Sequence, residues 1–172
     1  MMTDTNKTQS IRSLQREFHN ALVYARTEAV ARNQVVSICA SSNGASCSTE
    51  WGGGWLIFID NSSTGYADGV LDTGEALLRV NEYTGRAIAS VVDPDDSSAK
   101  SAIVFSLRGL MYDSTRAYVQ ICPSDADDGF ARGLMLERSG RVSYSRDSDG
   151  NGVHDRIFED DSGAPDNVDL DC

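Results

Sequence analysis

The stretch from Ser10 to Asn33 constrains the fold most, because its apolar residues recur with the period of an α-helix. Steps of three or four residues place them on one stripe of the helix surface. The stripe consists of Ile11, Leu14, Phe18, Leu22, Ala25 and Ala29. Neither Gly nor Pro interrupts the run. The pattern predicts one long amphipathic helix whose apolar face packs against a second layer.

After this helix, short apolar or alternating stretches are separated by turn residues, which predicts seven to nine antiparallel strands. The expected strands cover residues 34–39, 56–59, 76–80, 86–92, 102–107, 110–112, 117–122, 133–137 and 141–145. The oxygen-rich stretch from Asp60 to Glu75 lacks regular spacing and is predicted to be a solvated loop. The fold class is therefore α+β. We expect a single domain over residues 10–172, with a β region at 34–146, and a disordered or tag-like start at residues 1–9.

The composition argues against several classes of function. The chain has 172 residues and a formal net charge of −11, so its surface repels nucleic-acid backbones and anionic membranes. The two histidines, His19 and His154, have no plausible nucleophile beside them in the sequence. No G-x-S-x-G, H-E-x-x-H or phosphate-binding glycine loop is present. We expect neither catalysis nor a small-molecule substrate.

Four cysteines, Cys39, Cys47, Cys122 and Cys172, match no C-x-x-C metal motif. Their even number favours disulfides and an oxidising compartment, and the alternative is four free thiols. Three pairings are possible. Proximity in the sequence favours Cys39–Cys47, which leaves Cys122–Cys172 as a bridge that closes a loop of about 50 residues and contributes about 4 kcal/mol in the chain-entropy model. Because residues 1–9 contain no export signal, we expect that an N-terminal segment has been removed.

The last segment, residues 147–172, is acidic and poor in apolar residues, which is typical of disorder. A disulfide at Cys172 or a bound cation could order it. Its first residues have the spacing of an EF-hand-type loop, with Gly152 at the sharp turn. Phe158 occupies the twelfth position, so Glu159 is the nearest possible closing ligand. We predict a Ca²⁺ site, with an ion-free acidic turn as the alternative. The expected ligands are Asp147, Asp149, Asn151, the Val153 carbonyl and Asp155.

An ordered series of motifs extends over most of residues 10–145. Its members are Leu22, Ala25, Arg26, Glu28, Ala29, Arg32, Val36, Cys39, Cys47, Gly54, Trp55, Phe58 and Asp60, followed by the stretches 74–79 and 104–109, Cys122 and Gly140-Arg141. This series resembles the GspH/FimT family of minor pilins and pseudopilins. The acidic end of the chain extends beyond the core that the family shares.

The resemblance implies a pilin-like fold, a helical spine packed on antiparallel sheet, and a subunit without catalytic activity. It implies a minor pilin of the FimT/FimU type that helps to initiate type IV pilus assembly near the filament tip. The alternative within the family is an H-type minor pseudopilin of type II secretion. Partners would be the major pilin and other minor pilins or pseudopilins.

Members of this family also carry a hydrophobic half-helix at the N-terminus. It anchors them in the inner membrane, with the domain in the periplasm, before they join a cell-surface pilus or a periplasmic pseudopilus. Residues 10–33 would be the soluble half of that helix.

Two functions of other classes remain open. A Gly-Arg-x-Arg motif near the C-terminus of some FimT proteins is linked to DNA uptake. Here Gly140 and Arg141 match, Ser143 replaces the second arginine, and Arg146 follows. Arg141 and Arg146 are candidates for phosphate contacts, although the net charge disfavours DNA binding. The acidic tail motivates the other function, a calcium-dependent adhesive or ligand-binding subunit at the tip.

Overall fold

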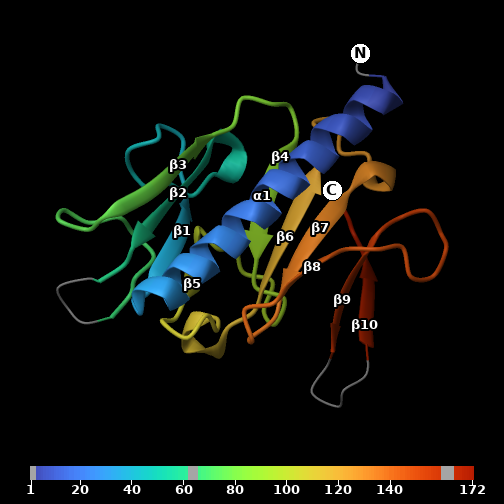
Figure 1. Ribbon diagram of the computed structural model, residues 1–172. Helices are drawn as coiled ribbons and strands as arrows, with labels where there is room; N and C mark the ends of the chain where they lie inside the picture. Colours follow the sequence, from blue (N-terminus) through green and yellow to red (C-terminus); the bar gives the residue numbers. More distant parts are fainter. Residues whose placement is uncertain (1–2, 62–65, 160–164) are drawn as a thin grey trace.

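The computed structural model describes residues 3–61, 66–159 and 165–172, with only the backbone at 159 and 165–167. One long helix lies across two four-stranded antiparallel sheets, and a two-stranded hairpin follows near the C-terminus (Figure 1). The fold is therefore the pilin-like α+β arrangement that the resemblance implies.

Helix α1 covers Asp4–Arg32, so it begins six residues before the predicted Ser10. The expectation of disorder at residues 1–9 is wrong for the helical residues from Asp4 onward, whereas residues 1 and 2 lie outside the described part. Asp4 stands in the first turn, where a negative charge is favoured by the helix dipole, and Lys7 forms an ion pair with Asp125. Asn33, with a φ of 54°, ends the helix.

The two larger sheets contain eight strands. The first sheet has the order β3-β2-β1-β5, with β1 Val36–Ala40, β2 Gly54–Ile59, β3 Leu77–Glu82 and β5 Ala102–Phe105. The second has the order β4-β6-β7-β8, with β4 Ile88–Val92, β6 Ala117–Cys122, β7 Arg132–Leu136 and β8 Val142–Tyr144. Three short 3₁₀ turns lie between strands of these sheets: η1 Trp51–Gly53, η2 Tyr112–Ser114 and η3 Asp128–Phe130.

Two predictions about the strands were wrong. Residues 110–112 form no strand, because Met111 makes one isolated bridge to Phe105 and the chain then enters η2, where Asp113 has a φ of 52°. The acidic segment, for which no strand was predicted, contains the hairpin of β9 Asp155–Glu159 and β10 Pro165–Asp169.

The hairpin is ordered by burial against the second sheet. Phe158 and Leu170 are 4% and 2% exposed and join a small cluster with Tyr118 and Met135. These partners lie far away in the sequence, so local composition gave no sign of them.

The main core lies between α1 and the two larger sheets. Every residue of the predicted apolar stripe is buried. At its centre, the ring of Phe18 lies 5.3 Å from that of Trp51 and 4.7 Å from that of Trp55. Burial of one such side chain contributes about 1.5–3 kcal/mol, so the helix is held by its packing rather than by its intrinsic propensity.

Candidate metal centre and surface groove

Three carboxylates converge in the loop between β8 and β9. Asp147, Asp149 and Asp155 each offer one oxygen atom, and these atoms all lie within 4.8 Å of one another. Carboxylate oxygens are the ligands that Ca²⁺ prefers, and three negative charges this close repel one another unless a cation lies between them. The structure thus brings together three of the predicted ligands.

The sequence of the loop explains this geometry. Gly150 and Gly152 have φ values of 80° and 94°, which L-residues rarely adopt. Their N–H groups donate to the two carboxylate oxygens of Asp147 at 2.6 and 2.9 Å. The hydrogen bond from Gly152 is the largest cause that lowers the pKa of Asp147 below its ordinary value. Asp147 is therefore ionised at neutral pH.

Asp155 is held from the preceding turn. It is 2% exposed, and its carboxylate accepts hydrogen bonds from the Ser148 hydroxyl and, at 2.6 Å, from the Ser148 N–H. The hydroxyl contact is the main cause that lowers the pKa of Asp155. A buried carboxylate kept ionised by hydrogen-bond donors retains lone pairs that a hard cation could share.

The other predicted ligands are Asn151, the Val153 carbonyl and Glu159, and each stands differently in the structure. The Asn151 side-chain oxygen accepts the Val153 N–H at 2.8 Å, and its NH₂ group donates to the two oxygens of Asp169 at 3.1 and 3.0 Å. The Val153 carbonyl stays a predicted ligand, because no contact described here tests it. The Glu159 side chain lies outside the described residues.

Asp169 is a site residue that the sequence reasoning missed. It pairs with Asp155 in the β9–β10 ladder, so the hairpin places a fourth carboxylate beside the loop. The alternation of acidic and apolar residues over 168–171 was a signal for a strand at this point.

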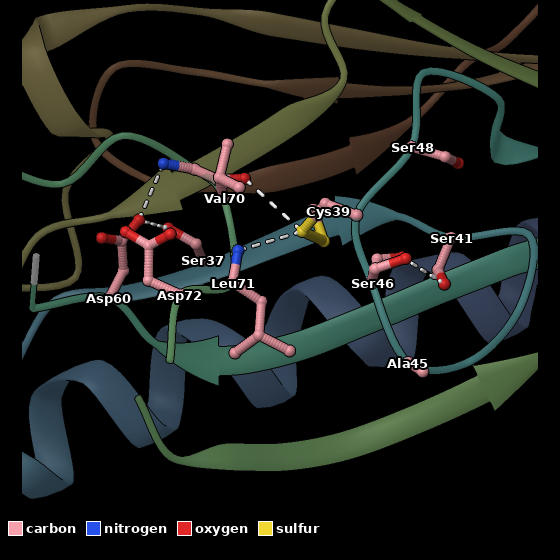
Figure 2. Close-up of a disulfide and its surroundings, with 12 residues drawn as sticks. Ser37, Cys39, Ser41, Ala45, Ser46, Ser48, Asp60, Val70, Leu71 and Asp72 are labelled. Carbon is pink, nitrogen blue, oxygen red and sulfur yellow. Dashed lines mark hydrogen bonds between the residues drawn. A yellow bond between two sulfur atoms is a disulfide. The ribbon is translucent and has the colours of Figure 1, made fainter. Parts of the chain in front are cut away.

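Both predicted disulfides are present, the one favoured by proximity and the one that this pairing leaves. Cys122 is bonded to Cys172, which fixes the end of the chain to β6, and Cys39 of β1 is bonded to Cys47 of the following loop. Figure 2 shows the second bridge, whose Cys47 sulfur accepts the Leu71 N–H at 3.2 Å.

Near this bridge lies Asp60, which the sequence analysis placed in a solvated loop. That interpretation was wrong for Asp60, which is 2% exposed. One of its oxygens accepts the Ser37 hydroxyl at 2.7 Å and the Gly69 N–H at 2.8 Å (Figure 2), while its other oxygen has no hydrogen-bond partner among the residues that the structure describes. Asp60 thus fixes the loop to β1 rather than facing water.

Arg141 and Arg146 line one groove of about 650 Å³ together with Arg138. Arg138 donates to the Ser114 carbonyl at 2.9 Å and lies 3.6 Å from a carboxylate oxygen of Asp95. Arg141 and Arg146 are exposed, and within the described ranges neither forms an ion pair. The two arginines singled out in the sequence therefore share one surface with a third that was not.

Comparison with protein families matches residues 14–140 to the model described as GspH, type II transport protein. No curated protein sequence matches the chain. Residues 141–172, which contain β8, the acidic loop and the hairpin, lie outside the matched range.

Comparison with solved structures gives minor pilins and pseudopilins. The type IV minor pilin FimU of Pseudomonas aeruginosa is 25% identical, with a TM-score of 0.59, over 78% of this chain and 87% of FimU. A second crystal form of FimU gives 26% identity and a TM-score of 0.58 over 77% and 90%. The minor pseudopilin EpsH of the Vibrio cholerae type II secretion system is 10% identical, with a TM-score of 0.51 over 80% and 94%, which shows a common fold alone.

Proposed function

The chain belongs to the GspH family, and we propose that within this family it is a minor pilin of a type IV pilus. The observation that carries the proposal is its 25–26% identity with FimU over more than three quarters of the chain, against 10% with EpsH. The alternative is the H-type minor pseudopilin of type II secretion. We place the subunit near the filament tip, where it helps to initiate assembly.

The exposed face of α1 supports a role in assembly. Val23 and Val30 are 44% and 54% exposed, whereas the apolar stripe of the same helix is buried in the domain core. Apolar side chains that remain exposed along one helix are suited to contact with another subunit. The proposed partners are the major pilin and other minor pilins, and we propose no catalytic role and no small-molecule substrate.

The proposed location is the inner membrane before assembly, with the domain in the periplasm, and the cell-surface pilus afterwards. The two disulfides support an oxidising compartment. Among the described residues, no helix combines the length and the apolar composition needed to cross a bilayer. The proposed membrane attachment therefore rests on the family and not on α1.

Deletion of the gene in its own host tests the assignment. We expect sheared surface pilin to fall while secretion of type II substrates continues, and a plasmid copy should restore the pili. Loss of secretion with normal surface pili would instead identify the H-type pseudopilin.

We also propose that the acidic loop binds Ca²⁺, which would neutralise the repulsion among Asp147, Asp149 and Asp155. Their convergence within 4.8 Å favours this proposal. Ca²⁺ at 100 times its dissociation constant adds about 2.7 kcal/mol to the free energy of unfolding. For a chain of this length, that corresponds to a rise of about 5–10 °C in the melting midpoint.

The test is a thermal melt of the oxidised protein in EDTA, in Ca²⁺ and in Mg²⁺. We expect the rise with Ca²⁺ alone, and we expect the variant Asp147→Asn/Asp149→Asn to abolish it. The matched control is Asp68→Asn/Asp72→Asn, which removes the same charge from another exposed loop. An equal rise in both variants, or no rise in the natural protein, would contradict a site at this loop.

A further inference from the structure

Strand β8 forms one edge of the second sheet, and two of its residues have backbone groups that no strand of the described residues pairs. β7 and β8 pair Leu136 with Val142 and Leu134 with Tyr144. Flanking bonds join the Ser145 N–H to the Gly133 carbonyl at 2.9 Å and the Glu137 N–H to the Arg141 carbonyl at 3.1 Å. Because bonding alternates along an antiparallel pair, the N–H and C=O groups of Val142 and Tyr144 point away from β7, towards the free edge.

The chain itself shows that this edge can accept a strand. The Arg146 carbonyl, two residues beyond Tyr144, accepts the Asp155 N–H at 2.8 Å, and the two residues form an isolated antiparallel bridge. β9 begins at that bridge but then pairs with β10 instead of continuing along β8. The groove of about 650 Å³ opens at this divergence, with β8 on one side and Ile157 of β9 on the other.

The two sides of the edge differ in chemistry. On the side of the hairpin, the groove carries three arginines, Arg138, Arg141 and Arg146, against one acidic residue, Glu137, in a chain with a net charge of −11. On the side of the helix, a second groove of about 490 Å³ is lined by Val23, Val30 and Val142. Arg26 also lines it, but its guanidinium donates to the Gly109 and Ser139 carbonyls. Arg141 borders both grooves. One side therefore favours carboxylates and the other favours apolar side chains.

We propose that the free edge of β8 binds an extended segment of a partner subunit in which acidic and apolar residues alternate. A strand paired with β8 directs successive side chains to opposite faces. Its acidic residues would meet Arg141 and Arg146, and its apolar residues would meet Val23 and Val30. This inference rests on the proposed function, because it names the surface by which the subunit contacts its neighbour.

The test uses the whole oxidised domain and a capped synthetic peptide, Val-Asp-Val-Asp-Val-Asp-Val. Hydrogen exchange followed by NMR should show fast exchange of the Val142 and Tyr144 amides in the free domain. At saturating peptide their exchange should slow by about tenfold or more, while the Ser145 amide, already bonded to β7, should change little. Unchanged exchange at Val142 and Tyr144 with peptide in millimolar excess would overturn the proposal.

Charge and backbone controls separate edge pairing from adhesion to the acidic surface. A peptide with lysine in place of aspartate, and the aspartate peptide methylated on alternate backbone nitrogens, should each bind at least about tenfold more weakly. The variant Arg141→Glu/Arg146→Glu should weaken binding to a similar extent. The matched variant Arg12→Glu/Arg16→Glu on α1 should not, and equal losses in both would contradict the proposal.

The same measurements distinguish this inference from the assignment as a minor pilin. A domain that supports pili in its host but leaves the Val142 and Tyr144 amides unprotected would overturn the edge pairing alone. Dimerisation through β8 that excludes the peptide would also overturn it, because the partner would then be a second copy of the chain.

Discussion

Residues 14–140 and residues 147–172 bury their apolar side chains to very different extents. In the first range, α1 and both larger sheets contribute to one continuous core. In the described part of the second range, which we call the C-terminal module, Phe158 and Leu170 are the two buried apolar side chains. A disulfide and a set of carboxylate contacts stabilise the rest. The comparison indicates that the family fold is maintained mainly by burial in its own core, whereas the module depends on its attachment to that fold.

The largest effect should come from the centre of the core. Phe18→Ala removes a completely buried ring that contacts Trp51 and Trp55, and should lower the free energy of unfolding by about 3–5 kcal/mol. Denaturant unfolding followed by tryptophan fluorescence measures this loss. Val23→Ala, at a position 44% exposed, is the control and should cost much less. Similar losses in both variants would mean that the helix is not held by its buried face.

The next effect should be confined to the C-terminal module. Cys122→Ser/Cys172→Ser removes a bridge that spans 50 residues and should cost about 2–4 kcal/mol. We expect limited proteolysis to cut first within 147–172 while α1 stays intact. The comparable variant Cys39→Ser/Cys47→Ser, whose bridge spans 8 residues, should leave the module protected. If Cys122→Ser/Cys172→Ser lost the whole fold at once, the module would not be separable from the family fold, which would contradict this account.

A smaller loss is expected at Asp60 within the family fold. Asp60→Ala leaves the buried Ser37 hydroxyl and the Gly69 N–H without their acceptor, which should cost about 1–3 kcal/mol. Asp60→Asn keeps one acceptor oxygen and should cost less. Chemical denaturation of the two variants side by side gives the difference, and an Asn variant as unstable as the Ala variant would show that the charge matters more than the acceptor.

The smallest effect should come from an exposed ion pair. The hydrogen bond from Arg116 lowers the pKa of Asp95, so this contact stabilises the fold above the unfolded pKa of about 3.9. As the pH falls through the lower folded pKa, the contribution is lost. Because Asp95 is partly exposed, the contribution of this contact to the free energy of unfolding should not exceed about 1 kcal/mol. The stability difference between the natural protein and Asp95→Asn should shrink on acidification, and a constant difference would exclude this cause.

The main helix and most strands could be predicted because their periodicity is a direct consequence of burial on one face. The apolar stripe from Ile11 to Ala29 needs no knowledge of its partner to be recognised. The first turns of α1 could not be predicted, because residues 4–9 are polar and Lys7 forms its ion pair with the distant residue Asp125.

Part of the candidate site could also be predicted, because some of its residues lie close together in the sequence. Asp147 and Asp155 belong to one local loop whose spacing is visible in the sequence. Asp169 reaches that loop through hairpin pairing, and Arg138 reaches the groove of Arg141 through the β7–β8 turn. The convergence of Asp169 with the loop depends on strand pairing between residues far apart in the sequence, which neither composition nor local spacing reports.

Native-state hydrogen exchange of the unmodified, oxidised protein tests most directly whether the C-terminal module opens separately from the family fold. The account predicts that amides of β9 and β10 exchange through an opening of lower free energy than amides of α1, β1 and β6, which should exchange through global unfolding. The two classes should stay separate as denaturant is added at low concentration. A single opening free energy shared by the hairpin and the core would contradict the account, because the module would then be an integral part of the family fold.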